Sequence, residues 1–238
     1  MSHTDQIQFF QQVIQHFPGF FSGKVIDIGS NDINGGPHKY VNASEYVGVD
    51  LGPGTNVNLV SRGEEVQLSS GYFDVAMSSE CFEHAPTWRA ILLNMIRMTR
   101  PGGLVAFSCA TTGRPEHGTT RSDGGFTAQL AVSGGQEYYA NVTPSQVREV
   151  LGVDLMTAYF IELNDRMFDL FFVGLKGGAT QADRKALEEC RVDVEKKYSK
   201  MASYDSKREF AINRTKRFVA RLARDSNLER ARKILYKP

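Results

Sequence analysis

Residues 24–36 read KVIDIGSNDINGG, an apolar run of β-forming residues that changes abruptly into small and turn-forming residues. The run predicts a buried strand over 24–29 and a loop at the carboxyl end of that strand. In open α/β sheets such a loop lies where ligands bind, because small residues let backbone N–H groups approach the ligand. Asn31 and Asn34 stand where the GxGxxG motif of dinucleotide-binding proteins has glycine, and the carboxylate of Asp32 disfavours a diphosphate.

Other compact β-rich runs predict further strands, with one helix between the last two. The runs are EYVGVD (45–50), NVNLV (56–60), FDVAMSS (73–79) and LVAFSCA (104–110), and the helix begins at Pro86. A strand–helix–strand order implies a parallel pair of strands. The strands are apolar throughout, which is typical of a sheet covered on both faces.

The later part of the chain distinguishes between α/β folds. Thr143 and Gln146 form a capping-box pattern that starts a helix ending at Gly152. Residues 153–177 contain two long β-rich runs joined at 164–166, which predicts an antiparallel hairpin. A dinucleotide-binding dehydrogenase domain would instead continue with parallel β-α units.

Composition and charge predict one globular domain with a basic helical extension. Hydrophobic residues make up 41% of the 238 residues and charged residues 23%. Residues 207–238 hold eleven Lys or Arg against three Asp or Glu, a balance of +8, while the whole chain carries only +1. We therefore expect a domain at 1–178 and an extension at 179–238, which either contacts anionic or membrane surfaces or presents a solvated helix face. Without a long apolar segment, a cytoplasmic location is expected.

Four motifs in order resemble those of the class I S-adenosylmethionine (SAM)-dependent methyltransferases, type 11-like, over about residues 23–176. The motifs are VIDIGSNDINGG, YVGVDL, FDVAMSSECFEHAPTW and MTRPGGLVAFS. The resemblance implies a Rossmann-like α/β fold, with a mainly parallel, doubly wound seven-stranded sheet that ends in the antiparallel hairpin. It also implies an enzyme that uses SAM and releases S-adenosylhomocysteine.

The resemblance also assigns cofactor contacts. Asp50 ends the second strand, where a carboxylate can accept hydrogen bonds from both ribose hydroxyls, in NAD as well as in SAM. The implied cofactor-binding residues are Asp27, Gly29, Ser30 and Asn31 around the methionine part, with Asp32 nearby, Asp50 at the ribose, Leu51, Gly63 and Glu64 at the adenine, and Ser78, Ser79 and Glu80 beside the methyl group. Arg62 stands where the family often has Asp, so the contact to the adenine amino group is open. Ser78 and Ser79 also fit a structural capping role.

Histidines and a long loop are the candidates for handling the methyl acceptor. His84 and His117 are candidate general bases, since imidazole titrates near neutral pH; a structural role for His84 and an exposed position for His117 are the alternatives. The loop 111–140 mixes polar and aromatic residues suited to a hydroxylated substrate. Its candidate substrate-binding residues are Arg114, Arg121, Tyr138 and Tyr139, the two tyrosines being equally suited to packing. No ligand spacing calls for a metal ion.

The acceptor class follows from a narrower resemblance. The TGRPEHG and YYANVTP stretches resemble methyltransferases of bacterial surface sugars. This implies O-methylation of a sugar in a nucleotide-sugar, polysaccharide or glycolipid. The alternatives are a small aromatic or lipid-like metabolite as acceptor, and a non-catalytic methyltransferase-like binding protein. Nucleic acid is not expected as a substrate, because SSEC stands where an NPPY-like motif would follow the fourth strand. The sequence leaves open whether the chain forms a homo-oligomer.

Overall fold

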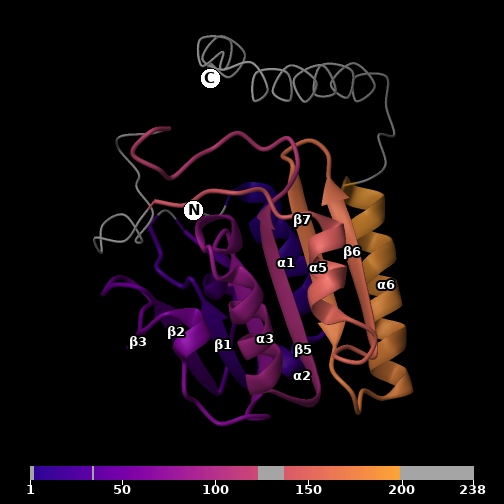
Figure 1. Ribbon diagram of the computed structural model, residues 1–238. Coiled ribbons are helices and arrows are strands. Elements are labelled where there is room, and N and C mark those ends of the chain that lie inside the picture. Colours follow the sequence, from indigo (N-terminus) through magenta and orange to yellow (C-terminus); the bar gives the residue numbers. More distant parts are fainter. Residues whose placement is uncertain (1–2, 34, 123–136, 199–238) are drawn as a thin grey trace.

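A single seven-stranded sheet organises the computed structural model, which describes residues 3–33, 35–122 and 137–198 (Figure 1). The strand order is β3-β2-β1-β4-β5-β7-β6. The strands are β1 Lys24–Ile28, β2 Glu45–Asp50, β3 Leu59–Val60, β4 Phe73–Ser79, β5 Thr99–Ala110, β6 Ala158–Asn164 and β7 Asp169–Leu175. Only β7 runs opposite to the other six, since it pairs antiparallel with both β5 and β6. This arrangement confirms the predicted fold class, including the terminal hairpin.

Helices cover both faces of the sheet, as the apolar strands require (Figure 1). On one face, α3 (Trp88–Met98) and α5 (Pro144–Leu151) pack over a core that includes Phe107 and Phe172. On the other face, a second core joins the sheet to α1 (Thr4–His16), α2 (Pro18–Phe21) and α6 (Gln181–Tyr198). Three short 3₁₀ turns connect these elements: η1 Pro37–Tyr40, η2 Gly63–Glu65 and η3 Phe82–His84.

Local signals explain where the helices begin. The α5 helix has the predicted capping box, in which the Thr143 hydroxyl accepts from Gln146 N and the Gln146 side chain accepts from Thr143 N. The α3 helix begins at Trp88 and not at Pro86, because Cys81–Ala85 forms the 3₁₀ turn η3 and its caps, and Thr87 becomes the N-cap. The His3 ring caps α1 and forms a capping box with Gln6.

The start of the predicted extension packs against the main sheet. Four buried side chains of α6, Leu187, Cys190, Val194 and Tyr198, belong to the core that α1 shares. The rest of the extension, with the basic stretch 207–238, lies outside the described residues, and the predicted boundary at 178 remains a prediction. Within the three described ranges, none of the helices combines the length and apolar composition needed to span a membrane.

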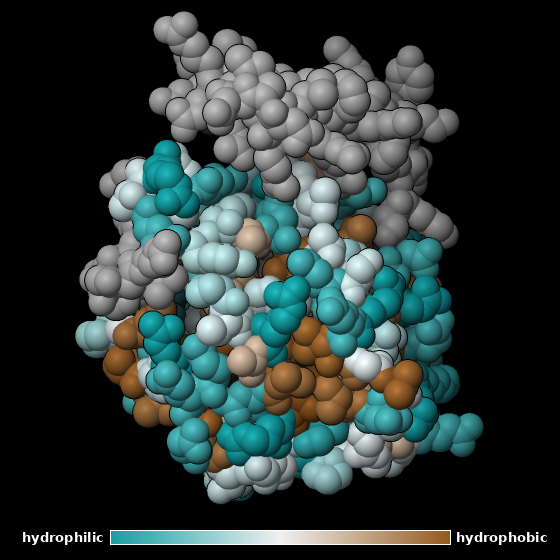
Figure 2. Space-filling model, viewed as in Figure 1, coloured by the Kyte–Doolittle hydropathy of each residue, from teal (hydrophilic) through white to brown (hydrophobic). Residues whose placement is uncertain are grey.

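The surface over α3 and α5 is mixed in character. Figure 2 shows mostly hydrophilic side chains on this face, with a group of apolar side chains toward its lower half. Large hydrophobic side chains that are exposed in the described part of the chain include Leu93, Val153 and Leu155.

Candidate active site

A cleft opens at the carboxyl ends of β1, β2 and β4, as expected for an open α/β sheet. It encloses about 1230 Å³ of empty space, including the part open to solvent. Eleven of the twelve predicted cofactor residues line it: Asp27, Gly29, Ser30, Asn31, Asp32, Asp50, Leu51, Gly63, Glu64, Ser79 and Glu80. The twelfth, Ser78, is fully buried and donates a hydrogen bond of 2.7 Å to the Ile28 carbonyl, which ties β4 to β1.

The turn after β1 brings the backbone close to the floor of the cleft. Gly29 has φ +81°, and a Cβ at this position would lie 2.7 Å from Cys81 Cβ. Glycine is therefore required both by the backbone conformation and by space. The Gly29 and Ser30 N–H groups donate to the Val49 carbonyl, which joins the turn to β2.

The carboxylate of Asp50 is held between two backbone segments. Its Oδ2 accepts from Asn31 N at 3.0 Å and its Oδ1 from Leu51 N at 2.7 Å. Each oxygen keeps a second lone pair for a ligand hydroxyl. Burial raises the pKa of Asp50, although both backbone N–H groups oppose the shift.

Asp27 lines the cleft and has one buried oxygen without a hydrogen-bond partner among the described residues. Tyr46 donates a hydrogen bond of 2.7 Å to Asp27 Oδ2, whereas Oδ1 is buried without a hydrogen-bond partner among the described residues. Burial raises the pKa of this carboxyl to about 7 from an ordinary 3.8, and the nearby Asp50 adds to the shift. A ligand ammonium group at Oδ1 would satisfy the oxygen and favour the ionised form. The amino group of SAM has this character.

Asp32 has partners of its own within the protein. It accepts a hydrogen bond from Gly35 N and forms ion pairs with His38 at 3.3 Å and Lys39 at 3.2 Å. Although burial raises the pKa of Asp32, these partners together hold it below its ordinary value. Asp32 therefore shapes the rim of the loop, and its charge is already compensated.

An apolar recess at Gly63 is suited to a flat ring. A Cβ at Gly63 would lie 2.7 Å from Ile28 Cγ2 and 3.1 Å from Ile91 Cγ2. The neighbouring Glu64 forms an ion pair of 3.7 Å with Arg62, the residue that departs from the family pattern. The recess lies beside Leu51, as an adenine site would.

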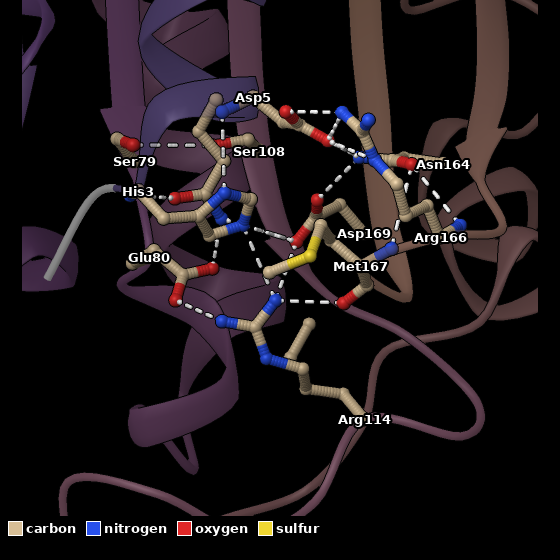
Figure 3. A network of polar contacts seen from close by, with 12 residues as sticks. His3, Asp5, Ser79, Glu80, Ser108, Arg114, Asn164, Arg166, Met167 and Asp169 are labelled. Atoms are coloured by element: carbon tan, nitrogen blue, oxygen red, sulfur yellow. Dashed lines mark hydrogen bonds and ion pairs between the residues drawn. The ribbon is translucent and has the colours of Figure 1, made fainter. Parts of the chain in front are cut away.

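Glu80 follows β4 directly and belongs to a buried network that Figure 3 shows from close by. Its carboxylate accepts from Gln6 Nε2 of α1 and pairs with Arg114 at 3.4 Å and with His117 at 3.2 Å. Although burial raises the pKa of Glu80, the His117 hydrogen bond and the Arg114 charge hold it well below its ordinary value. The carboxylate is thus ionised and held in position by α1 and by the loop after β5.

Arg114, a predicted substrate contact, is occupied in this network. Its Nη1 lies 2.9 Å from Asp169 Oδ1 and 2.7 Å from the Met167 carbonyl, and His3 Nε2 lies 3.0 Å from the same Asp169 oxygen (Figure 3). Asp169 is fully buried at the start of β7. Arg114 therefore joins the carboxyl end of β4 to β7.

The two candidate bases lie together on the cleft wall. The rings of His84 and His117 meet edge to face at 5.1 Å, and the Tyr139 ring packs against both. Burial lowers the pKa of His84 to about 3, with the charge of His117 adding to the shift, so His84 is neutral near pH 7. His117 Nδ1 lies 3.1 Å from the Pro115 carbonyl, which can only accept, so this nitrogen carries a proton.

The remaining predicted substrate residues lie away from the cleft lining. Arg121 is exposed and pairs with Glu116 at 2.8 Å and Glu137 at 3.5 Å, and Tyr138 is half-buried outside the cleft. Neither Glu83 nor the α1 partners of Glu80 were among the sequence candidates. Glu83 stands beside the candidate base His84 in the sequence, but Ala110, whose N–H it accepts, lies 27 positions away. Gln6, which donates to Glu80, lies 74 positions away from it. No local pattern indicates either contact.

Comparisons with known proteins agree with this architecture. Residues 26–107 match the model of a family described as a methyltransferase domain. Two curated relatives, each described as an uncharacterized methyltransferase, come from Mycobacterium sp. strains KMS and MCS and are 36% identical over 93 residues. The match covers 32% of this chain and 36% of each relative, so the chain spans just over a third of their length.

A solved structure extends the likeness to most of the described sheet. It is the Burkholderia thailandensis 1,6-didemethyltoxoflavin-N1-methyltransferase with bound 1,6-didemethyltoxoflavin and S-adenosylhomocysteine. The TM-score is 0.50 at 17% identity, over 73% of this chain and 79% of that one. The chain therefore has the fold of the class I methyltransferases, and its residues 26–107 carry the sequence pattern of a methyltransferase domain.

Proposed function

We propose that the protein is a SAM-dependent methyltransferase. The observation that carries the proposal is that Asp50, the Gly29 turn and Asp27 line one cleft, and that Asp27 Oδ1 has no hydrogen-bond partner among the described residues. Together they fit the ribose, the methionine chain and the amino group of a nucleoside sulfonium. The methyltransferase domain match over residues 26–107 supports the same reading.

The residues at the inner end of the cleft fit methyl transfer to an oxygen. When bound, SAM would supply an electrophilic methyl group: the acceptor oxygen would gain it as the S–C bond breaks, the bonding electrons would stay on sulfur, and the acceptor proton would pass to solvent water. Glu80, Ser79 and the two histidines line the wall where the predicted methyl position lies. These groups would orient a polar acceptor for in-line attack, which is the main contribution an enzyme makes to such a displacement.

The histidines are poorly suited to acting as free bases in this arrangement. Neutral His84 has a pKa of about 3, so it binds a proton weakly near pH 7. The Nδ1 of His117 is protonated toward Pro115, and its Nε2 lies 3.2 Å from the Glu80 carboxylate. We therefore assign His117 to positioning the acceptor, with Glu80 as its partner.

The acceptor we would test first is a small saccharide hydroxyl. The polar wall formed by Glu80, His84 and His117 favours a hydroxylated acceptor over an apolar one. The surface-sugar resemblance of TGRPEHG and YYANVTP points the same way. A nitrogen acceptor on a small heteroaromatic molecule is the second candidate, because the aromatic ring of His117 lines this wall and is held edge to face by the Tyr139 ring.

Calorimetric titration of the full chain tests the cofactor assignment. SAM and S-adenosylhomocysteine should bind saturably at one site per chain, whereas NAD should not bind. Binding of NAD alone, or of neither class, would overturn the proposal. A radiolabelled methyl transfer screen with nucleotide-sugars, free saccharides and heteroaromatic amines would then separate the acceptor classes.

A further inference from the structure

Three side chains that the proposed methyl transfer does not require as bases converge on one point. Glu83 and His84 lie in η3, directly after β4, and His117 lies in the loop after β5. One ligand atom from each lies within 4.8 Å of the others. Gly118, at φ +64°, permits this approach, since a Cβ there would lie 2.9 Å from His84 Cε1.

A hydrogen bond at Nδ1 fixes the orientation of the His117 ring. Its Nδ1–H donates to the Pro115 carbonyl, which also accepts from the Tyr139 hydroxyl at 3.0 Å. Its Nε2 faces the carboxylates of Glu80 at 3.2 Å and Glu83 at 3.9 Å. A metal-ligating histidine commonly donates its other ring N–H to a backbone carbonyl, which fixes both tautomer and ring orientation.

Two polar atoms of the cluster lack partners. Among the described residues, Glu83 Oε2 and His84 Nδ1 are buried without a hydrogen-bond partner, and the Glu83 side chain is 0% exposed. The other Glu83 oxygen, Oε1, accepts a hydrogen bond from Ala110 N at 3.0 Å, which fixes the orientation of the carboxyl group. Buried polar atoms are nearly always satisfied, and an ion is one of the standard explanations for those that are not.

Glu83 also lacks a basic partner. The carboxylates of Glu80 and Asp169 share the Arg114 guanidinium, whereas Glu83 has no Lys or Arg ion pair among the described residues. Burial and the neighbouring Glu80 charge raise the pKa of Glu83 well above its ordinary value. A cation between Glu83 and the two imidazoles would take the place of the carboxyl proton.

We propose that Glu83, His84 and His117 bind one divalent cation at the wall of the cleft, with the Glu80 carboxylate beside it. Two imidazoles and one carboxylate form a donor set that Zn²⁺ and other first-row ions accept while keeping a position open. Mn²⁺, Co²⁺ and Zn²⁺ are therefore the expected occupants. The sequence does not reveal the set, because His117 follows His84 by 33 positions.

The cation has a chemical use in the cleft. An ion at this wall would favour the ionised form of a nearby acceptor hydroxyl, which neither histidine is placed to deprotonate. This use rests on the proposed methyltransferase function, whereas the binding site itself rests only on the cluster.

Titration of the chelator-treated full-length protein with CoCl₂ tests the site directly. Calorimetry gives stoichiometry and affinity, and visible absorption of the ion reports on its ligands. The test variants are Glu83→Gln, His84→Gln and His117→Gln. The matched control is His38→Gln, since His38 lines the same cleft but pairs with Asp32. One ion per chain should bind, and each test variant should weaken binding by about tenfold or more, with the control unchanged.

The outcomes separate this inference from the cofactor proposal. Absence of saturable Co²⁺ binding, or equal binding by the three test variants and the wild type, would overturn the metal site. S-adenosylhomocysteine is titrated into each chelator-treated protein in parallel, so intact cofactor binding leaves the methyltransferase proposal standing. Thermal unfolding of each variant checks its fold. His117 is 26% exposed in a loop, so His117→Gln keeps the test decisive if Glu83→Gln does not fold.

Discussion

The Tyr46 hydroxyl of β2 donates a hydrogen bond of 2.7 Å to Asp27 Oδ2 of the neighbouring β1, and within the described part of the chain the other Asp27 oxygen has no hydrogen-bond partner. This pair gives the cleft a buried carboxyl group whose charge state depends on what binds there. The pKa of Asp27, raised to about 7 by burial, lies within the range of ordinary assays.

Cofactor affinity should therefore depend on pH through Asp27. The ionised carboxylate attracts the ammonium group of S-adenosylhomocysteine, so affinity should rise between about pH 6 and pH 8. In Asp27→Asn the affinity should be weaker at pH 8 and nearly independent of pH over this range. Calorimetry at several pH values measures both. A wild-type affinity that falls as pH rises would contradict the assignment.

The free energy of unfolding should also depend on the ionisation of Asp27, but it should fall as pH rises. Between about pH 4 and pH 7 the unfolded chain has lost the Asp27 proton while the folded chain still keeps it. The unfolded state then binds fewer protons, so this group lowers the free energy of unfolding as pH rises through that range. Asp27→Asn should lose less stability than the wild type from pH 4 to pH 7 in urea unfolding. If the wild type and Asp27→Asn lose the same stability over this pH range, the raised pKa of Asp27 is excluded.

Asp50 and Asp32 provide a matched pair of carboxylates in the cleft. Asp50→Asn should weaken S-adenosylhomocysteine binding about 10- to 100-fold, because a charge-assisted contact contributes roughly 1.5–3 kcal/mol. Asp32→Asn should have the smaller effect, since the Lys39 ammonium already pairs with that charge at 3.2 Å. Calorimetry of both variants at one pH shows which variant loses more affinity for S-adenosylhomocysteine. A larger loss in Asp32→Asn would transfer the ribose role away from Asp50.

Gly29 and Gly19 test the requirement for a left-handed turn at the cofactor loop. Gly29→Ala should reduce the free energy of unfolding by about 1–3 kcal/mol and weaken cofactor binding, because Gly29 has φ +81° and its new Cβ would meet Cys81. Gly19→Ala, in α2 with no heavy atom within 4 Å of its Cβ, should be neutral or slightly stabilising. Urea unfolding and calorimetry measure the two effects. Equal behaviour of both variants would remove the strain argument.

Local patterns predicted most of the architecture. The capping box at Thr143 placed the start of α5, and EYVGVD marked the bounds of β2. The strand predicted at 56–60 is shorter in the structure, where β3 covers only Leu59–Val60. Asn56 adopts φ 69°, and the Asn58 side chain accepts a hydrogen bond from Gly48 N at 2.7 Å. The Asn58 side chain satisfies a backbone N–H group of β2 in place of strand pairing. Strand propensity alone does not reveal such a side-chain contact.

The cofactor side of the site was more predictable than the acceptor side. Asp27 and Gly29 lie at the carboxyl end of β1 and Asp50 ends the neighbouring β2, so the topology of the sheet brings them together. The partners of Glu80 come instead from α1 and the loop after β5. The bond between His3 and Asp169 joins residues 166 positions apart, and no local signal indicates such a pairing.

Arg114 and Arg121 distinguish a structural arginine from a substrate-binding one. Arg114→Met would leave the fully buried carboxylates of Glu80 and Asp169 without their shared cation, so the free energy of unfolding should fall by about 3–5 kcal/mol. Arg121→Met removes an exposed ion pair with Glu116 and should cost no more than about 1 kcal/mol. Urea unfolding of both variants measures the difference. If Arg114→Met unfolds like the wild type while KM for the acceptor rises, Arg114 contacts substrate, as its place in the loop suggested.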